Sequence, residues 1–164
     1  MHGKKHNNTM KTTEKTMKRV ARRASFEYRD DRSRNLLEVF NRLFNAIADA
    51  RVEDVLRLAV AHPARRFWVS EERALRVVHE MERTGVPPSC NALKREMYEE
   101  IYRRVCMVRG SHPRWTLARC VGYVVNQEAP SFYLSVSSAH AILVKEKRRC
   151  RMETLRRLSR HLAA

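Results

Sequence analysis

The chain has few glycines and lacks the short motifs of nucleotide-dependent and metal-dependent enzymes. Only four glycines occur among 164 residues, and no GxxxxGK[ST], GxSxG or other glycine-rich loop is present. No HExxH motif occurs, and the aspartates do not pair as a two-metal site requires. These absences predict a protein that is not an enzyme and uses no cofactor or small-molecule substrate. A metal-free nuclease that uses His and Lys stays open as an alternative.

The chain also lacks a cysteine pair, a metal-binding cluster and a long hydrophobic run. None of its four cysteines forms a CxxC pair, and the seven histidines are scattered, so we expect no metal. The apolar neighbours of Cys106 and Cys120 predict buried, reduced thiols. No run of about 18 apolar residues exists, which predicts no membrane-spanning helix. Polar residues follow the first five, where a secretory signal has an apolar segment, so we expect a cytoplasmic protein.

Positive charge is the one large excess in the composition. Thirty-four Lys and Arg stand against 18 Asp and Glu, which leaves a net charge of +16. Residues 1–34 carry a net charge of +7 and residues 140–164 a net charge of +6, whereas residues 35–139 carry only +3. A protein with such an imbalance repels itself unless it meets a polyanion. The clustering at both ends therefore favours nucleic acid as the partner.

One aromatic segment occurs twice in the chain. Phe67-Trp68-Val69-Ser70 recurs 65 residues later as Phe132-Tyr133-Leu134-Ser135. At the same offset, identical residues pair on both sides of the segment: Val60 with Val125, Ala64 with Ala129, Ala74 with Ala139, and Arg83 with Arg148. A fixed offset over this length predicts one supersecondary unit used twice, over about residues 52–84 and 117–149. We expect Phe67 and Phe132 in the core because large aromatic side chains bury much apolar surface.

Apolar residues recur every three to four positions from residue 34 onward, which predicts helices. A helix of about 20 residues that begins at Ser89 or Asn91 would connect the two units. We therefore expect an all-α multi-helix bundle built from two related helix–aromatic segment–helix units joined by a long central helix. Residues 34–149 would form its core. Residues 1–33 would be a basic arm, disordered or partly helical, and residues 150–164 a basic helical extension.

Several strings resemble those of small basic helical proteins from gut-bacterial genomes and mobile elements. They are the aromatic–Val–Ser segment Trp68-Val69-Ser70, the helical string Lys94-Arg95-Glu96-Met97, and the segment from Val124 to Leu134. The resemblance covers about residues 33–149 and leaves the basic ends outside. It implies a shared fold and a bacterial or element-borne origin, and it supplies no known activity.

Two basic segments supply the candidate nucleic-acid contacts. The planar guanidinium of Arg holds phosphate oxygens through two parallel hydrogen bonds, which makes Arg-rich helices suited to phosphates. The candidate residues are Lys18, Arg19, Arg22 and Arg23 in the arm, and Lys145, Lys147, Arg148, Arg149, Arg151, Arg156, Arg157 and Arg160 near the C-terminus.

A helix–turn–helix interpretation of each unit favours DNA over RNA as that nucleic acid. The linker of about eight residues is longer than the three or four of a tight turn. In the first unit, the second helix is almost neutral, whereas its counterpart in the second unit carries many Arg and few acids. If one unit contacts DNA, we therefore expect the second to do so, in a protein associated with the nucleoid.

Two other interpretations remain open. The chain would be a protein–protein adaptor of a phage or mobile-element assembly if its basic ends served only solubility. A basic C-terminal helix would lie on an anionic membrane if Met152, Leu155, Leu158 and Leu162 were inserted, but that apolar stripe lacks aromatic residues. We expect no membrane partner, and the sequence leaves the oligomeric state and any sequence specificity open.

Overall fold

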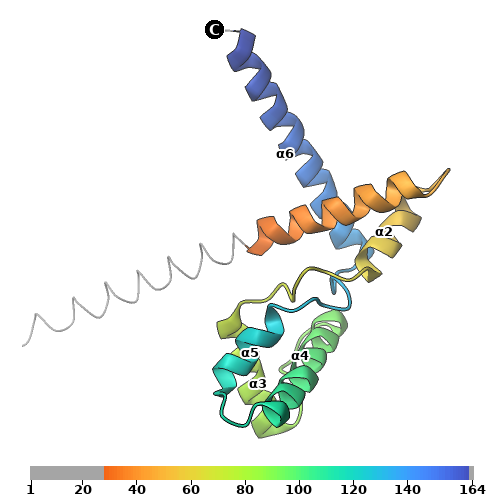
Figure 1. Ribbon diagram of the computed structural model, residues 1–164. Coiled ribbons are helices and arrows are strands. Elements are labelled where there is room, and N and C mark those ends of the chain that lie inside the picture. The colour runs from red at the N-terminus through yellow and green to blue at the C-terminus, as the bar shows by residue number, and fades with distance from the viewer. Residues whose placement is uncertain (1–27, 163–164) are drawn as a thin grey trace, which may run out of the picture.

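The computed structural model describes residues 28–162, and every regular element in that range is a helix. The helices are an N-terminal helix over residues 28–46, α2 (Val52–Ala61), α3 (Glu71–Thr84), α4 (Ala92–Ser111), α5 (Leu117–Val125) and α6 (Val136–Leu162) (Figure 1). The all-α prediction is confirmed. The core boundary expected at residue 34 falls inside the N-terminal helix, where Ser33 is already buried.

Local signals explain where these helices begin and end. The side chain of Ser70 accepts a hydrogen bond from the backbone N–H of Arg73 at the start of α3 (3.2 Å), and Asn91 accepts one from Lys94 at the start of α4 (2.9 Å). These side chains satisfy backbone donors that the first turn of a helix leaves free. Gly85 ends α3 at a φ of 73°, a left-handed conformation that favours glycine.

The helices pack in two groups (Figure 1). In one group, α3, α4 and α5 pack against one another. In the other, α2 packs against α6, and the N-terminal helix crosses α6, with the ammonium of Lys147 lying 4.7 Å from the ring centre of Phe40. Residues 62–70 and residues 126–135 carry the chain between the two groups.

These two connecting segments are bonded to each other and form a seam between the groups. Ala64 and Ala129 exchange two backbone hydrogen bonds, each 2.9 Å long. Two further backbone hydrogen bonds flank this pair: Phe67 N–H donates to Val125 O (3.1 Å), and Phe132 N–H donates to Val60 O (3.0 Å). Buried backbone groups need such partners, so the seam fixes the position of one group against the other.

The helix–turn–helix interpretation is wrong for this chain. No contact joins α2 to α3 or α5 to α6, although each pair is consecutive in sequence. Instead, α2 packs against α6 and α3 packs against α5. The reason is that each connecting segment runs from one group of helices to the other, so two consecutive helices lie in different groups.

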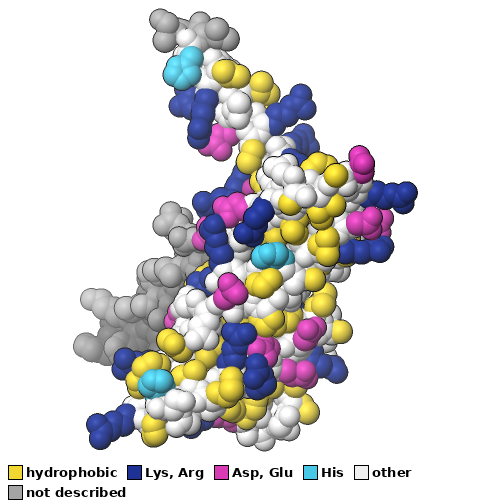
Figure 2. Space-filling view, turned by 45° about the vertical axis from the view of Figure 1, so that its right-hand side comes forward, with side chains coloured by type: hydrophobic (Ala, Val, Ile, Leu, Met, Phe, Trp, Pro, Cys, Tyr) yellow, Lys and Arg dark blue, Asp and Glu magenta, His cyan; other side chains and the backbone are white. Residues whose placement is uncertain are grey.

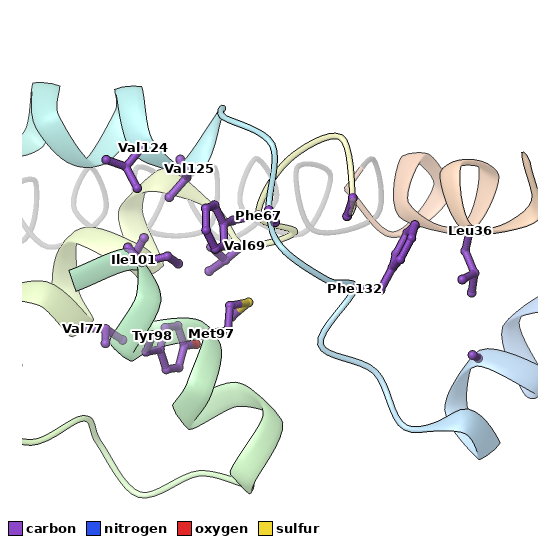
Figure 3. Close-up of a cluster of buried hydrophobic side chains, with 14 of the residues drawn as sticks. Leu36, Phe67, Val69, Val77, Met97, Tyr98, Ile101, Val124, Val125 and Phe132 are labelled. Carbon is purple, nitrogen blue, oxygen red and sulfur yellow. The ribbon is translucent and has the colours of Figure 1, made fainter. Parts of the chain in front are cut away.

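The aromatic segments supply side chains to both sides of the seam (Figure 3). Phe67 is buried beside Val125 and Ile101, whereas Phe132 lies beside Leu36 of the N-terminal helix. Tyr133 adopts a positive φ of 50° and stacks on Phe67, with ring centres 6.2 Å apart. Each group of helices therefore has its own aromatic anchor, and the two anchors flank the Ala64–Ala129 pair.

Candidate nucleic-acid interface

The second half of α6 leaves the packed body. Ala139, Leu143 and Glu146 are buried on the first half, but every residue from 147 to 161 is exposed. Fifteen helical residues at 1.5 Å per residue extend about 22 Å. Figures 1 and 2 show this half as a free arm that projects from the other helices. Lys147 and Arg149 still contact the N-terminal helix, but the residues beyond them pack against no described element and present their side chains to a partner.

The structure places eight of the candidate residues on this helix. Lys18, Arg19, Arg22 and Arg23 lie outside the described residues. The remaining eight are exposed on α6: Lys145, Lys147, Arg148, Arg149, Arg151, Arg156, Arg157 and Arg160.

Acidic partners take up only a few of these eight charges. Arg149 forms ion pairs with Glu146 (2.8 Å) and with Asp30 of the N-terminal helix (3.3 Å), and Arg157 pairs with Glu153 (3.0 Å). Within residues 28–162, the other cations of α6 form no ion pair: Lys145, Lys147, Arg148, Arg151, Arg156 and Arg160. Exposed ion pairs are weak, so even Arg157 stays available to a phosphate.

Four of the cations share one face of the helix. At 3.6 residues per turn, the side chains of Lys145, Arg149, Arg156 and Arg160 lie within about 60° of one another around the axis. We call these four residues the basic stripe. Its base lies beside the start of the N-terminal helix, because Arg149 contacts Asp30. The start of the described N-terminal helix and the base of the basic stripe are thus neighbours, although more than 100 residues separate them in sequence.

An apolar strip occupies a different face of α6. Val144, Leu155 and Leu158 are 54%, 48% and 54% exposed, and no described residue covers them. Because Ala139 and Leu143 turn another face toward the body, the strip is not a continuation of the core. It is the main feature of α6 that the charge-based prediction does not use.

The outer face of α4, in contrast, neutralises its own charges. Glu100 accepts hydrogen bonds from Arg103 (2.8 Å) and Arg104 (2.6 Å). The hydrogen bond from Arg103 is the main cause that lowers the pKa of Glu100. Arg104 also donates to the carbonyl oxygen of Glu128 (2.8 Å) and lies over the ring of Phe67. These arginines hold the fold together, as their alternation with glutamates suggests, and they are poor candidates for phosphate contacts.

Residues 28–162 contain neither a metal-binding cluster nor a membrane-spanning helix. No group of three or more His, Cys, Asp or Glu side chains in this range is arranged to hold a metal ion. All four cysteines are free, but only Cys120 is buried; the prediction of a buried Cys106 is wrong, because that residue lies on the solvent side of α4. None of the described helices combines the length and the apolar composition needed to cross a bilayer.

Comparison with known proteins adds no constraint beyond this geometry. No family model, curated protein or solved structure matches the chain. The interface is therefore defined by its own charge and exposure.

Proposed function

We propose that the protein binds nucleic acid, without catalysing a reaction, through the basic stripe of α6 and the basic arm at the N-terminus. The observation that carries this proposal is the free half of α6, where 15 consecutive residues are exposed and most cations have no acidic partner. Unpaired, solvated cations gain most from phosphate contacts because the contacts release counterions from the nucleic acid. Because Arg149 contacts Asp30, the helix that follows the arm in sequence begins beside the basic stripe, and we expect one polyanion to contact both.

The form of the interface favours DNA over RNA. A helix with side chains is about 10–12 Å across, and the major groove of B-form DNA is about 12 Å wide. The major groove of A-form RNA is deep and narrow, so a helix does not enter it. A basic helix that projects from its scaffold is also the means by which continuous basic-region helices contact DNA. In a bacterial cell, such a protein would associate with the nucleoid.

We also propose that the scaffold consists of two copies of one unit, longer than the sequence repeat indicates. The hydrogen bond from Phe67 to Val125 and that from Phe132 to Val60 are related by the same 65-residue shift, and Ala64 pairs with Ala129. The shift also relates buried positions of the N-terminal helix and α4: Leu36 with Ile101, and Phe40 with Val105. On this view α4 is the first helix of the second copy and not merely a connector.

The two proposed copies differ most where the function is placed. The last helix of the first copy, α3, has 14 residues, whereas the last helix of the second copy, α6, has 27. The additional length carries Arg151, Arg156 and Arg160. The difference suggests that the second copy gained a nucleic-acid contact while the first kept a scaffolding role.

Hydrogen exchange with and without a DNA duplex tests where the nucleic acid binds. Beyond Arg149, the free half of α6 makes no contact with the described body, and a helix of this length is marginal alone, so its amides should exchange rapidly in the unbound protein. Bound duplex should slow exchange over residues 147–162, while α3 and α4 stay unchanged. Slowing confined to α3, α4 or α5 would refute the α6 interface.

The adaptor alternative has one observation in its favour. The apolar strip of Val144, Leu155 and Leu158 is suited to a protein partner, because a nucleic-acid backbone gives it nothing apolar to contact. As an adaptor of a phage or mobile-element assembly, the protein should still capture its partner after Lys145, Arg148, Arg156 and Arg160 are replaced by Gln, because the apolar strip stays intact and the basic residues would serve only solubility. The same substitutions should weaken nucleic-acid binding under the main proposal.

A further inference from the structure

A second cationic site lies on the body of the protein, and no α6 residue lines it. It is a cavity of ≈ 700 Å³ between the start of the N-terminal helix, the segment at Trp68, and the first turns of α3 and α4. Four cations from three helices line it: Arg29, Arg32, Arg73 and Lys94. Its volume falls in the usual range of small-molecule sites, which is about 300–1,000 Å³.

Arg32 is the most unusual of these cations. The side chain is half-buried, and its Nε is buried without a hydrogen-bond partner. Burial is the main cause that lowers the pKa of Arg32, and the neighbouring Arg29 contributes. Arg nevertheless stays charged at neutral pH. A partly buried charge without a counter-charge is costly, so an anion bound in the cavity would stabilise Arg32.

No carboxylate that lines the cavity supplies this balance. Glu72 is the acidic residue among the lining side chains, and it forms an ion pair with Arg76 (3.1 Å). The first turn of α4 contains no acidic residue and instead carries Lys94. A cation near the N-terminus of a helix is unfavourable by itself, because that end of the helix dipole is positive. The arrangement becomes favourable when an anion lies between the cation and the helix N-terminus.

Aromatic side chains form another part of the cavity wall. Trp68 is half-buried, and its indole Nε1–H is enclosed without an acceptor. Tyr28 also lines the cavity, with the guanidinium of Arg66 lying 4.6 Å from its ring centre. An indole that faces a cavity is suited to stack on a planar ring, and nucleobases stack on aromatic side chains without regard to sequence.

We propose that this cavity binds a 5′-nucleoside monophosphate group, with the phosphate between Arg32 and Lys94 and the base against Trp68. The group is supplied either by a free nucleotide or by the phosphorylated end of a nucleic-acid strand, since both present the same chemistry. This inference goes beyond the proposed function and does not depend on it, because the residues differ from those of the basic stripe.

AMP and inorganic phosphate are the probes for the free ligand. In a Trp115→Phe background, Trp68 is the remaining tryptophan of the chain, so its fluorescence reports on the cavity. AMP should change this fluorescence and raise the melting temperature. Arg32→Gln should weaken AMP binding at least about 10-fold, because a charge-assisted hydrogen bond is lost. Arg42→Gln, which removes a charge from the exposed face of the same helix, should leave AMP binding unchanged.

A structural role for Arg32 predicts a different outcome. If Arg32 only held the fold, Arg32→Gln would lower the melting temperature of the ligand-free protein. The proposal predicts that this temperature is unchanged or higher, because the substitution removes an unbalanced buried charge, while the stabilisation by AMP disappears. A fall in ligand-free stability with unchanged AMP affinity would overturn the proposal.

Short single strands with a 5′-phosphate or a 5′-hydroxyl distinguish the two sources. They are added to the full chain with the α6 substitutions Lys145→Gln, Arg148→Gln, Arg156→Gln and Arg160→Gln, so that the basic stripe contributes little. Binding of AMP supports a free nucleotide, and preference for the 5′-phosphorylated strand over its hydroxyl counterpart supports a strand end. Equal binding of both strands without AMP binding, or no binding of any probe, refutes the site and leaves duplex binding by α6 untouched.

Discussion

Replacing Lys145, Arg148, Arg156 and Arg160 together by Gln should weaken the binding of duplex DNA about 10²–10³-fold near 0.1 M salt. Within residues 28–162, none of these side chains forms an ion pair, so the substitutions remove phosphate contacts without breaking an ion pair of the fold. Gln also preserves helix propensity, so α6 should stay helical. Fluorescence anisotropy with a short labelled duplex measures the affinity, and circular dichroism checks the helix content.

A matched variant distinguishes the effect of where the positive charges lie from the effect of the net charge. Arg42, Arg51, Arg83 and Arg95 are exposed on the body and, within the described range, have no acidic partner. Replacing these four by Gln removes the same number of positive charges far along the chain from the basic stripe. DNA affinity should stay within about 3-fold of the unmodified chain, since nonspecific net charge acts weakly at this salt concentration. Equal losses in both variants would contradict an interface on α6.

Phe67→Ala should lower the free energy of unfolding by about 3–5 kcal/mol. The side chain is 0% exposed, its ring stacks on Tyr133, and the guanidinium of Arg104 lies 5.1 Å from its centre. Its removal leaves a cavity beside the seam that joins the two groups of helices. Because domains of this size are stable by about 5–15 kcal/mol, the variant should lose roughly a fifth or more of its stability. Urea denaturation followed by circular dichroism measures the change.

Phe44→Ala is the control for that substitution. Phe44 also stacks on an aromatic neighbour, Phe40, with ring centres 5.6 Å apart, but it is 42% exposed. Less apolar area returns to water, so the cost should stay below about 1.5 kcal/mol. A similar cost for both residues would mean that the seam is not the anchor of the fold.

The helices could be predicted because their signals are local. Apolar residues at helical spacing mark each packed face, and Ser70 and Asn91 cap α3 and α4 through hydrogen bonds that the sequence indicates. Pro63 and Gly85 mark ends for similar reasons. Such interactions act within one turn of a helix, so the distant chain does not alter them.

The packing of the helices could not be predicted in the same way. The repeat suggested that each helix packs against its successor, whereas α2 packs against α6 and α3 against α5. This choice depends on backbone hydrogen bonds between Ala64 and Ala129, which are 65 residues apart. The spacing of apolar residues within helices does not predict a hydrogen bond between two irregular segments.

The candidate site, too, could be predicted only in its local features. The charge count located the cations of α6. It did not show that this helix projects from the body, or that Glu146 is buried and pairs with Arg149. The cavity at Trp68 was missed as a site because Arg32, Arg73 and Lys94 come from three separate helices. Its sequence signal was faint: a helix start at Asn91 with Lys instead of an acid in the first turn.

Titration of the unmodified chain with duplex DNA over a range of salt concentrations tests the main proposal most directly. Each phosphate that a cation contacts contributes about −0.9 to the slope of log affinity against log salt concentration. A polyanion held by the basic stripe and the N-terminal arm should therefore give a slope of about −4 or steeper. Affinity that stays flat as salt rises, or no binding in dilute buffer, would contradict a nucleic-acid interface built from the charged ends of this chain.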